Sequence, residues 1–332
     1  MSNNVVLIIT HSNDNQSVET VAKHLLGYGV RVARFNTDLF PTKVSIASYQ
    51  GLDKEQVLTL ETGEQYLLSD IGAIWYRRFH IARDLPKDID RQTRNACFEE
   101  SKRTVLGYFD ALNVFKIDDY WSIRKASSKE LQLIKADEQG IDIPDTLTTN
   151  DPQAALNFYN KHNGNIITKM QTAFAIYEDG KENVVFTNPV KESDLDRLED
   201  LRFCPMQFQQ SLPKELELRA TVVGDKVFCI AINSNEFQTE NYDWRRKGAT
   251  TLAAWFAYDL PEQEAHKLIK LTKSLGLNYG AADYILTPNG ELKFLEINPC
   301  GEFYWAEAYQ KQEICAALAS HLVSNMAKKR EL

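Results

Sequence analysis

The sequence predicts a mixed fold in which an N-terminal α/β unit is followed by two α+β lobes. An apolar run at residues 5–9 is followed by helically spaced apolar residues at 17–26 and by a second apolar run at 30–35. The chain therefore opens strand, helix, strand, which begins an α/β layer. Short predicted strands predominate after about Asp118, and the length of 332 residues suits two or three domains that share an interface.

Further elements extend this pattern along the chain. In the first unit, residues 43–49, 56–60 and 71–78 are predicted strands, and residues 93–112 are a predicted helix. The helices predicted in the two lobes span residues 127–139, 152–161, 193–201, 262–275 and 312–327. These elements predict an N-terminal α/β domain over residues 1–117, a central lobe over 118–210 and a C-terminal lobe over 211–332.

The overall charge limits the kind of partner. Lys and Arg number 38 against 46 Asp and Glu, which gives a net charge of −8 in a chain of ordinary globular composition. Binding a nucleic-acid backbone usually requires a basic face, so no nucleic-acid partner is expected. An acidic protein can still hold a polyphosphate where a few cations gather or where a metal ion is supplied.

The N-terminus and the cysteines favour a cytoplasmic protein. The apolar run at 5–9 is too short for a signal sequence, and no segment approaches the ~20 apolar residues of a membrane-spanning helix. The five cysteines are odd in number and form no CxxC pair, so neither a disulfide framework nor a zinc site is indicated. We therefore expect a cytoplasmic location and no membrane partner.

A predicted hairpin near the C-terminus carries the clearest chemical signal. Asn289-Gly290 is a strong two-residue turn, which would set Pro288 opposite Glu291. Counting back along both strands places Ile285 opposite Phe294 and Asp283 opposite Glu296. Because side chains alternate along a strand, Asn298 shares the face of Glu296. Two carboxylates and one amide oxygen are therefore expected to meet at the open end of the hairpin.

Two carboxylates directly opposite each other destabilise a hairpin unless a cation lies between them. Oxygen ligands suit Mg²⁺, with Mn²⁺ as the alternative, better than zinc. Two other interpretations stay open. The carboxylates could extend into water at an exposed edge, or a bulge at Gly290 could shift the register by one residue and separate them.

At this point the chain resembles a known family. The residues Asn278–Asp283 and Phe294–Pro299 resemble the C-terminal metal signature of the ATP-grasp ligases, and more narrowly of the microviridin-type (graspetide) peptide ligases, which are related to RimK-like ligases. The resemblance covers essentially the whole chain in order. The other stretches that carry it are Phe35-Asn36-Thr37-Asp38, Trp75-Tyr76-Arg77-Arg78, Lys129-Glu130-Leu131-Gln132-Leu133, Thr168-Lys169-Met170, Pro205-Met206-Gln207-Phe208-Gln209, Glu217-Leu218-Arg219, Asp243-Trp244-Arg245 and Gly301-Glu302-Phe303.

The resemblance implies an ATP-grasp fold with a pre-ATP-grasp domain, a central lobe and a C-terminal lobe. It also implies ATP and two Mg²⁺ ions as cofactors, with Asp283, Glu296 and Asn298 as metal ligands. Arg219 matches the arginine that steadies the transferred phosphate, and an ion pair with Glu217 is its alternative. The residues implied to bind ATP are Lys129, Lys169, Gln207, Phe208, Gln209 and Asn233.

A final group of residues is implied to contact a peptide substrate. Arg77 and Arg78 end a predicted strand of the α/β layer, where ligand crevices lie. Strand alternation sends them to opposite faces, so at most one is expected in the site. The charged helix at 193–201 resembles the place where related ligases dock a leader peptide, and a solvated surface helix is its alternative. The remaining candidates are Asp194, Asp196, Arg197, Asp243, Arg245 and Glu302.

The reaction implied by the resemblance joins side chains within a ribosomal precursor peptide. An Asp or Glu side chain is activated as an acyl phosphate, and a Thr or Ser hydroxyl (favoured) or a Lys amine then displaces phosphate. The implied partner carries a leader and a core rich in Thr, Ser, Asp and Glu, and a homodimer is compatible with the sequence. The alternative is a RimK-like ligase that adds an amino acid to a protein or small peptide.

Overall fold

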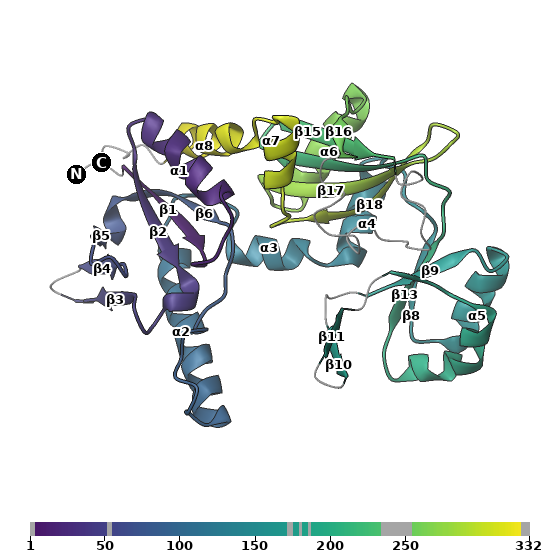
Figure 1. Ribbon diagram of the computed structural model, residues 1–332, viewed down its shortest axis with the longest axis horizontal. Helices are drawn as coiled ribbons and strands as arrows, with labels where there is room; N and C mark the ends of the chain where they lie inside the picture. The colour runs from purple at the N-terminus through teal and green to yellow at the C-terminus, as the bar shows by residue number, and fades with distance from the viewer. Residues whose placement is uncertain are drawn as a thin grey trace.

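The computed structural model describes residues 4–51, 55–170, 175–178, 181–184, 187–233 and 254–326. Figure 1 shows three parts along the long axis of the molecule: a parallel sheet at the N-terminal end, a small lobe at the other end, and a five-stranded sheet between them. The mixed α/β and α+β fold expected from the sequence is confirmed. The limits of the three predicted domains stay a prediction.

The N-terminal part is built on a four-stranded parallel sheet in the order β2-β1-β6-β7. All six residues of β1 are buried, which explains the uninterrupted apolar run in the sequence. Its strands and helices are β1 (Val5–Thr10), α1 (Ser17–Gly27), β2 (Arg31–Asn36), η1 (Thr37–Leu39), η2 (Leu68–Asp70), β6 (Ile71–Tyr76), α2 (Arg91–Ala111) and β7 (Phe115–Ile117). A separate antiparallel sheet contains β3 (Ser45–Ser48), β4 (Gln56–Thr59) and β5 (Gln65–Leu67).

The small lobe contains an antiparallel sheet in the order β12-β9-β13-β8. The helices α5 and η3 cover this sheet, because Ala155 and Leu201 share a core with Ile166 and Phe208. The elements of the lobe are β8 (Thr146–Thr149), α5 (Pro152–Lys161), β9 (Ile166–Lys169), β12 (Asn188–Pro189), η3 (Glu192–Arg202) and β13 (Met206–Gln210). A two-stranded hairpin, β10 (Ala175–Glu178) and β11 (Lys181–Val184), projects beside it (Figure 1).

The middle sheet is antiparallel, with the order β16-β15-β14-β17-β18. Its elements are β14 (Leu216–Val223), β15 (Lys226–Ile232), β16 (Phe256–Ala257), α6 (Glu262–Ser274), β17 (Tyr279–Leu286) and β18 (Leu292–Asn298). The helix expected over 127–139 is confirmed as α4 (Lys129–Glu138), whose start is capped by Ser128, and a further helix, α3 (Tyr120–Ala126), precedes it. Ala126 and Ala136 of these helices pack with Leu268 and Phe294 against this sheet.

The C-terminal helices return to the N-terminal part of the molecule. The last two are α7 (Tyr304–Gln310) and α8 (Ile314–Ser324). Leu318 and Leu322 of α8 lie in one core with Val21 of α1 and Trp75 of β6, and Val223 of β14 joins the same core. The N-terminal part and the middle sheet therefore share a hydrophobic core. None of the described helices is long and apolar enough to cross a membrane.

Candidate active site

Strands β17 and β18 bring the predicted oxygen ligands together. Asp283 lies directly opposite Glu296, and Ala281 lies opposite Asn298. Because side chains alternate along a strand, Asn298 shares the face of Glu296. The predicted pairing of the two carboxylates is therefore confirmed, whereas their role as metal ligands stays a prediction.

The turn that closes this hairpin differs from the expected one. The Gly290 N–H donates to the Thr287 carbonyl and the Thr287 N–H donates to the Glu291 carbonyl, both at 2.9 Å. The loop therefore has three residues, with Gly290 at a φ of +80°, which is typical of such loops. The prediction that Pro288 faces Glu291 is wrong, because Thr287 takes that place. This turn shifts the register of the two strands by one residue next to the turn. The sequence analysis had left such a shift at Gly290 open as an alternative.

A bulge in β18, between the turn and the two carboxylates, reverses the one-residue shift in register. Tyr284 pairs with Phe294 and Asp283 pairs with Glu296, so Leu295 is an extra residue on its strand. The predicted pairing of Ile285 with Phe294 is consequently wrong. Two irregularities of opposite effect thus leave the site in the register expected for a regular hairpin.

Arg219 on β14 lies opposite Asp283 in the sheet. Its Nη1 is 3.0 Å from Asp283 Oδ1 and donates to the Ala281 carbonyl at 3.3 Å. Glu217, the alternative partner of Arg219, instead lies 3.2 Å from Lys214 Nζ. The Nε of Arg219 is buried and, within the described part of the chain, has no hydrogen-bond partner. A buried guanidinium with unused donor capacity suits a site for anions.

Lys129 is the first residue of α4, and its side chain contacts the second facing carboxylate, Glu296. Its Nζ is 3.2 Å from Glu296 Oε2 and donates to the Met170 carbonyl at 2.9 Å. Since Met170 directly follows β9, Lys129 joins the small lobe to the middle sheet. Each of the two facing carboxylates is thereby paired with one cation from another element.

Lys169, the last residue of β9, adds a third cation. Its Nζ donates to Gln209 Oε1 at 2.6 Å. Loss of water around the ammonium group lowers the pKa of Lys169 to about 8, although the nearby Glu296 charge opposes this shift. The positive charge of Lys129 lowers the pKa further. The structure therefore brings both predicted phosphate-binding lysines to the two carboxylates.

The predicted nucleotide-binding residues on β13 divide between two faces of the strand. Gln207 and Gln209 are buried, and Gln209 Nε2 donates to Thr146 Oγ1 at 3.0 Å while its Oε1 accepts from Lys169. The side chain of Phe208 lies in the core beneath α5 and η3. Only Gln209 of these three is linked to the lysines by a side-chain contact. Asn233 directly follows β15, where Ile232 pairs with Glu217.

One residue at the site was missed by the sequence analysis. Gln132 lies on the buried side of α4, one turn after Lys129, and is 3% exposed. Its side-chain amide accepts from the Ile297 N–H at 3.0 Å and donates to the Ile297 carbonyl at 2.8 Å. Since β18 is an edge strand, Gln132 satisfies backbone groups between Glu296 and Asn298 that would otherwise lack partners. The sequence feature that could have revealed Gln132 was a glutamine on the apolar face of a helix.

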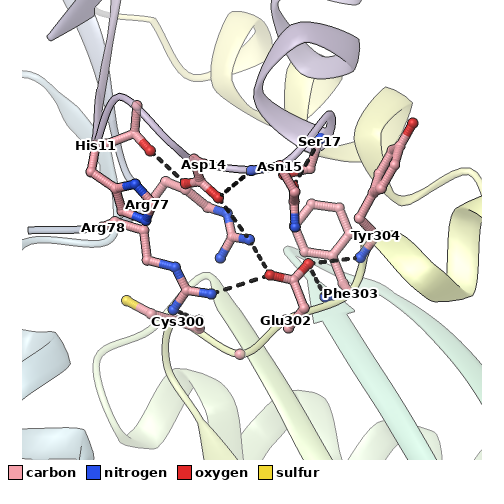
Figure 2. Close-up of polar contacts among 12 residues, drawn as sticks. His11, Asp14, Asn15, Ser17, Arg77, Arg78, Cys300, Glu302, Phe303 and Tyr304 are labelled. Carbon is pink, nitrogen blue, oxygen red and sulfur yellow. Dashed lines mark hydrogen bonds and ion pairs between the residues drawn. The ribbon is translucent and has the colours of Figure 1, made fainter. Parts of the chain in front are cut away.

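Arg77 and Arg78 lie just beyond β6, which ends at Tyr76. Figure 2 shows both side chains directed at Glu302: the Nη2 atoms of Arg77 and Arg78 are 2.5 and 3.1 Å from Glu302 Oε2. The expectation that the two arginines point to opposite faces is therefore wrong, because strand alternation does not extend past the strand end. Arg77 is also 3.6 Å from Asp14 Oδ1.

Glu302 is tightly held by these contacts. Its Oε1 accepts from the backbone N–H groups of Phe303 and Tyr304 at 3.0 and 3.1 Å. Burial alone raises the pKa of a carboxyl group, but the Arg77 charge and these hydrogen bonds outweigh it and lower the pKa of Glu302 to about 2. Contact of Glu302, Arg77 or Arg78 with a substrate stays a prediction.

The remaining predicted substrate contacts lie elsewhere. On η3, Asp194 Oδ2 accepts from the Lys191 N–H at 2.8 Å and Arg197 pairs with Asp200 at 2.7 Å. Asp196 is exposed on the same helix. These three residues are exposed on η3 of the small lobe, whereas Asp283 and Glu296 lie on β17 and β18 of the middle sheet. Asp243 and Arg245 lie outside the described residues.

The hairpin residues fit a magnesium ion shared with phosphate. The donor set consists of two carboxylates and one amide oxygen, which are hard ligands. Within the described residues, no cluster of three or more His, Cys, Asp or Glu side chains is placed to hold a metal. Mg²⁺ usually binds through one or two carboxylates together with phosphate oxygens and water, rather than in an all-protein cage. A site with two carboxylates beside three cations matches that requirement.

The chain is similar to a known family model and to solved structures. The model of the MvdD pre-ATP-grasp domain matches residues 5–124. The macrocyclase MdnC of Microcystis aeruginosa MRC, crystallised with the precursor peptide MdnA, is 41% identical over 96% of this chain and 99% of its own, with a TM-score of 0.87. An ATP-grasp ligase associated with ribosomal peptides from Chryseobacterium gregarium, in complex with ADP and a leader and core peptide, is 36% identical over 98% of both chains, with a TM-score of 0.92.

A curated relative lies further away. A probable alpha-L-glutamate ligase of Histophilus somni (strain 2336) is 26% identical over 240 residues, which are 71% of each chain. The fold, the paired carboxylates and these similarities define an ATP-grasp ligase. Within that class, the chain belongs to the microviridin-type, or graspetide, peptide ligases.

Proposed function

We propose that this protein is an ATP-dependent macrocyclase that joins side chains within a ribosomal precursor peptide. The observation that carries the proposal is the 41% identity, over 96% of the chain, to a macrocyclase crystallised with its precursor peptide. The site geometry supports it, because three cations surround two facing carboxylates where a polyphosphate and a metal would bind.

The proposed reaction has two steps. An oxygen of a substrate Asp or Glu carboxylate attacks the γ-phosphorus of ATP, which gives an acyl phosphate and releases ADP. A Thr or Ser hydroxyl oxygen then attacks the acyl carbon, phosphate leaves, and the hydroxyl proton is released. The peptide loses one water per ring, and the product is an ω-ester. A Lys amine as the attacking group would give an ω-amide instead.

This chain's own residues contribute binding and charge stabilisation. Lys129 and Lys169 hold the nucleotide phosphates, and Arg219 stabilises charge on the transferred phosphoryl group and on the acyl phosphate. The groups proposed to hold the rest of the nucleotide are Gln207, Phe208, Gln209 and Asn233. Asp283, Glu296 and Asn298 would hold Mg²⁺, which supplies charge neutralisation at the phosphates. Two ions are proposed, and Mn²⁺ is the alternative metal.

The proposed partner is a precursor peptide with a leader and a core rich in Thr, Ser, Asp and Glu. The exposed helix η3, with Asp194, Asp196 and Arg197, is the proposed leader-docking site, and Asp243 and Arg245 complete the proposed peptide contacts. We propose a cytoplasmic enzyme, with a homodimer as its oligomeric form.

Mass spectrometry tests the proposal directly. A candidate precursor peptide with a leader and a core rich in Thr, Ser, Asp and Glu is incubated with the protein, ATP and Mg²⁺, and each ring appears as the loss of one water. The weaker similarity to a probable glutamate ligase, 26% identical, is the observation behind the alternative of a RimK-like ligase. That alternative predicts a mass increase by an added amino acid, so the two functions give opposite mass changes.

A further inference from the structure

The N-terminal part of the molecule contacts both chain ends of the hairpin formed by β17 and β18. We call this set of contacts the hairpin anchor. It comprises Arg77, Arg78 and Asp118 from the N-terminal part, and Asn278, Tyr279, Cys300 and Glu302 from the hairpin ends. The anchor lies at the same end of the hairpin as the facing carboxylates.

The first half of the anchor holds the start of β17. Asp118 directly follows β7 and is 2% exposed. Its Oδ1 accepts from the backbone N–H and the side-chain amide of Asn278, both at 2.8 Å, and its Oδ2 accepts from the Tyr279 N–H at 3.0 Å. These hydrogen bonds fix the strand four residues before Asp283.

The second half holds the turn that follows β18. Arg77 and Arg78 both pair with Glu302, and Arg78 Nη1 donates to the Cys300 carbonyl at 3.3 Å (Figure 2). The Gly301 N–H donates to the Asn298 carbonyl at 3.1 Å, so the same turn begins at the predicted amide ligand.

The two halves are also joined to each other. The Tyr279 hydroxyl donates to the Gly301 carbonyl at 2.7 Å. The Phe303 ring packs against Tyr279 and lies 5.6 Å beneath the Arg77 guanidinium. Both ends of the hairpin therefore form one polar unit with the carboxyl edge of the parallel sheet.

The burial of Arg77 indicates a structural use for its charge. Its side chain is 2% exposed and its Nη2 is within ion-pair distance of both Asp14 and Glu302. Glu302 occupies the Nη2 side of this guanidinium, whereas its Nε and Nη1 are buried and have no hydrogen-bond partner among the described residues. Groups that support metal ligands from behind set the orientation of those ligands, and their loss weakens metal binding.

We propose that Arg77, Arg78, Asp118 and Glu302 are positioning residues, which hold the open end of the hairpin in the geometry required for metal-nucleotide binding. The inference rests on the proposed function, because it assigns the metal and nucleotide to the face of Asp283 and Glu296. It differs from the expectation that the arginines and Glu302 contact the peptide.

The test compares two variants from the two halves of the anchor. Glu302→Gln removes the charge that both arginines share, and Asp118→Asn turns one acceptor of the start of β17 into a donor. In each variant we expect the affinity of the protein–ADP complex for Mn²⁺, measured by calorimetry, to fall on the order of 10- to 100-fold. Backbone amide exchange within residues 278–303 should become faster, while the affinity for the precursor peptide stays unchanged.

Asp84→Asn is the matched control, because it removes an exposed ion pair with Lys43 in the same part of the molecule. That variant should bind Mn²⁺ as the wild type does. Thermal unfolding establishes that each variant is folded. If Glu302→Gln does not fold, Arg78→Lys, which keeps the charge and loses the forked contact with Cys300 and Glu302, takes its place.

Two results would overturn the inference. Unchanged Mn²⁺ affinity in the anchor variants would show that the hairpin end is held without these residues. Normal Mn²⁺ affinity with a loss of precursor binding would assign the arginines and Glu302 to the substrate. A wild-type protein that binds neither ADP nor Mn²⁺ would contradict the proposed function, a different result from an anchor variant that behaves as the wild type.

Discussion

Two groups of charged side chains flank the open end of the β17–β18 hairpin, and they are built differently. At the facing carboxylates, Asp283 and Glu296 have side chains that are 22% and 19% exposed, and they form ion pairs with Arg219 and Lys129. In the hairpin anchor, the Glu302 side chain is 34% exposed, yet it accepts from two guanidinium groups and two backbone N–H groups. Arg77 is buried at 2% exposed, as is Arg219 at 8%.

The pKa shifts in the two groups differ. In the hairpin anchor, burial raises the pKa of Asp118 to about 7 despite its hydrogen bonds to Asn278 and Tyr279. The anchor lowers the pKa of Glu302 to about 2, so its carboxylate is firmly charged. At the facing carboxylates, desolvation lowers the pKa of Lys169 to about 8. The shift of Lys169 comes first from burial, and the positive charges of Lys129 and Lys214 add to it. An anionic ligand beside these lysines would offset their like charges, whereas the charge of Glu302 already faces two guanidinium groups of the protein.

The largest expected effect is on a facing carboxylate. Glu296→Gln should abolish water loss from the precursor peptide, because it removes one of the two negative charges proposed to hold Mg²⁺ and leaves Lys129 without its ion-pair partner. Mass spectrometry of the peptide and ADP release measure this. Glu291→Gln, on the same hairpin but 58% exposed, should leave the reaction intact. Full ring formation by Glu296→Gln would contradict the metal assignment.

A smaller loss of activity is expected when Arg219 is substituted. Arg219→Gln should lower kcat on the order of 10²- to 10³-fold, because it removes a fixed charge aimed at the transferred phosphoryl group. Steady-state ADP release measures kcat, and circular dichroism checks folding, since Asp283 loses its partner. Arg219→Lys, which keeps the charge without the planar fork, should recover part of the rate. A kcat unchanged in Arg219→Gln would limit this residue to pairing Asp283.

The pH dependence of nucleotide binding tests the lowered pKa of Lys169. Phosphate binding requires the ammonium form, so ADP affinity should fall as pH rises above about 8, by up to about tenfold per pH unit. Calorimetry between pH 7 and pH 9.5 measures this fall. Lys169→Arg cannot lose its proton in that range and should show a flatter profile.

The lowered pKa of Lys169 also affects stability, which should rise with pH where ADP affinity falls. The folded pKa of Lys169 lies below its ordinary value of 10.5, so the unfolded chain binds more protons between those pH values. The contribution of Lys169 to the free energy of unfolding therefore rises with pH over that interval and is lost as pH falls through about 8.

Equal ADP affinity of the wild type at pH 7 and pH 9.5 would argue against Lys169 as a phosphate ligand.

The smallest effect is expected at the closed end of the hairpin, far from both charged groups. Gly290 has a φ of +80°, and a Cβ there would meet no atom within 4 Å. Gly290→Ala should therefore lower the free energy of unfolding by about 1 kcal/mol through backbone strain alone, with kcat unchanged. Urea denaturation measures the difference. Gly107→Ala, in the open surroundings of α2, should be neutral or stabilising. A large loss of activity in Gly290→Ala would mean that the turn controls the site.

Much of the fold could be predicted because periodicity is a local property. The strand-helix-strand opening and the charged helix near residues 193–201 were both found from spacing. The prediction failed at the end of β6, because alternation was extended beyond Tyr76 to Arg77 and Arg78. The short helix α3 was not predicted.

The site was predicted in part for the same reason. Asp283, Glu296 and Asn298 are close in sequence, so counting along one hairpin was sufficient to group them. The contacts of Glu302 and Gln132 could not be found in this way. Arg77 and Glu302 are separated by 225 residues, and Gln132 and Ile297 by 165 residues. No local pattern encodes such a contact.

The sequence by itself therefore determined which residue types meet on the hairpin, because strand pairing and side-chain alternation act over a few residues. It also determined the fold class, through apolar periodicity. Only the tertiary structure decided how charge is balanced there. A bulge at Leu295 preserved the register against the three-residue turn, and packing of the N-terminal part against the middle sheet put Arg77 and Arg78 on Glu302. Charge balance depends on distance in space and burial, and both are properties of the packed chain.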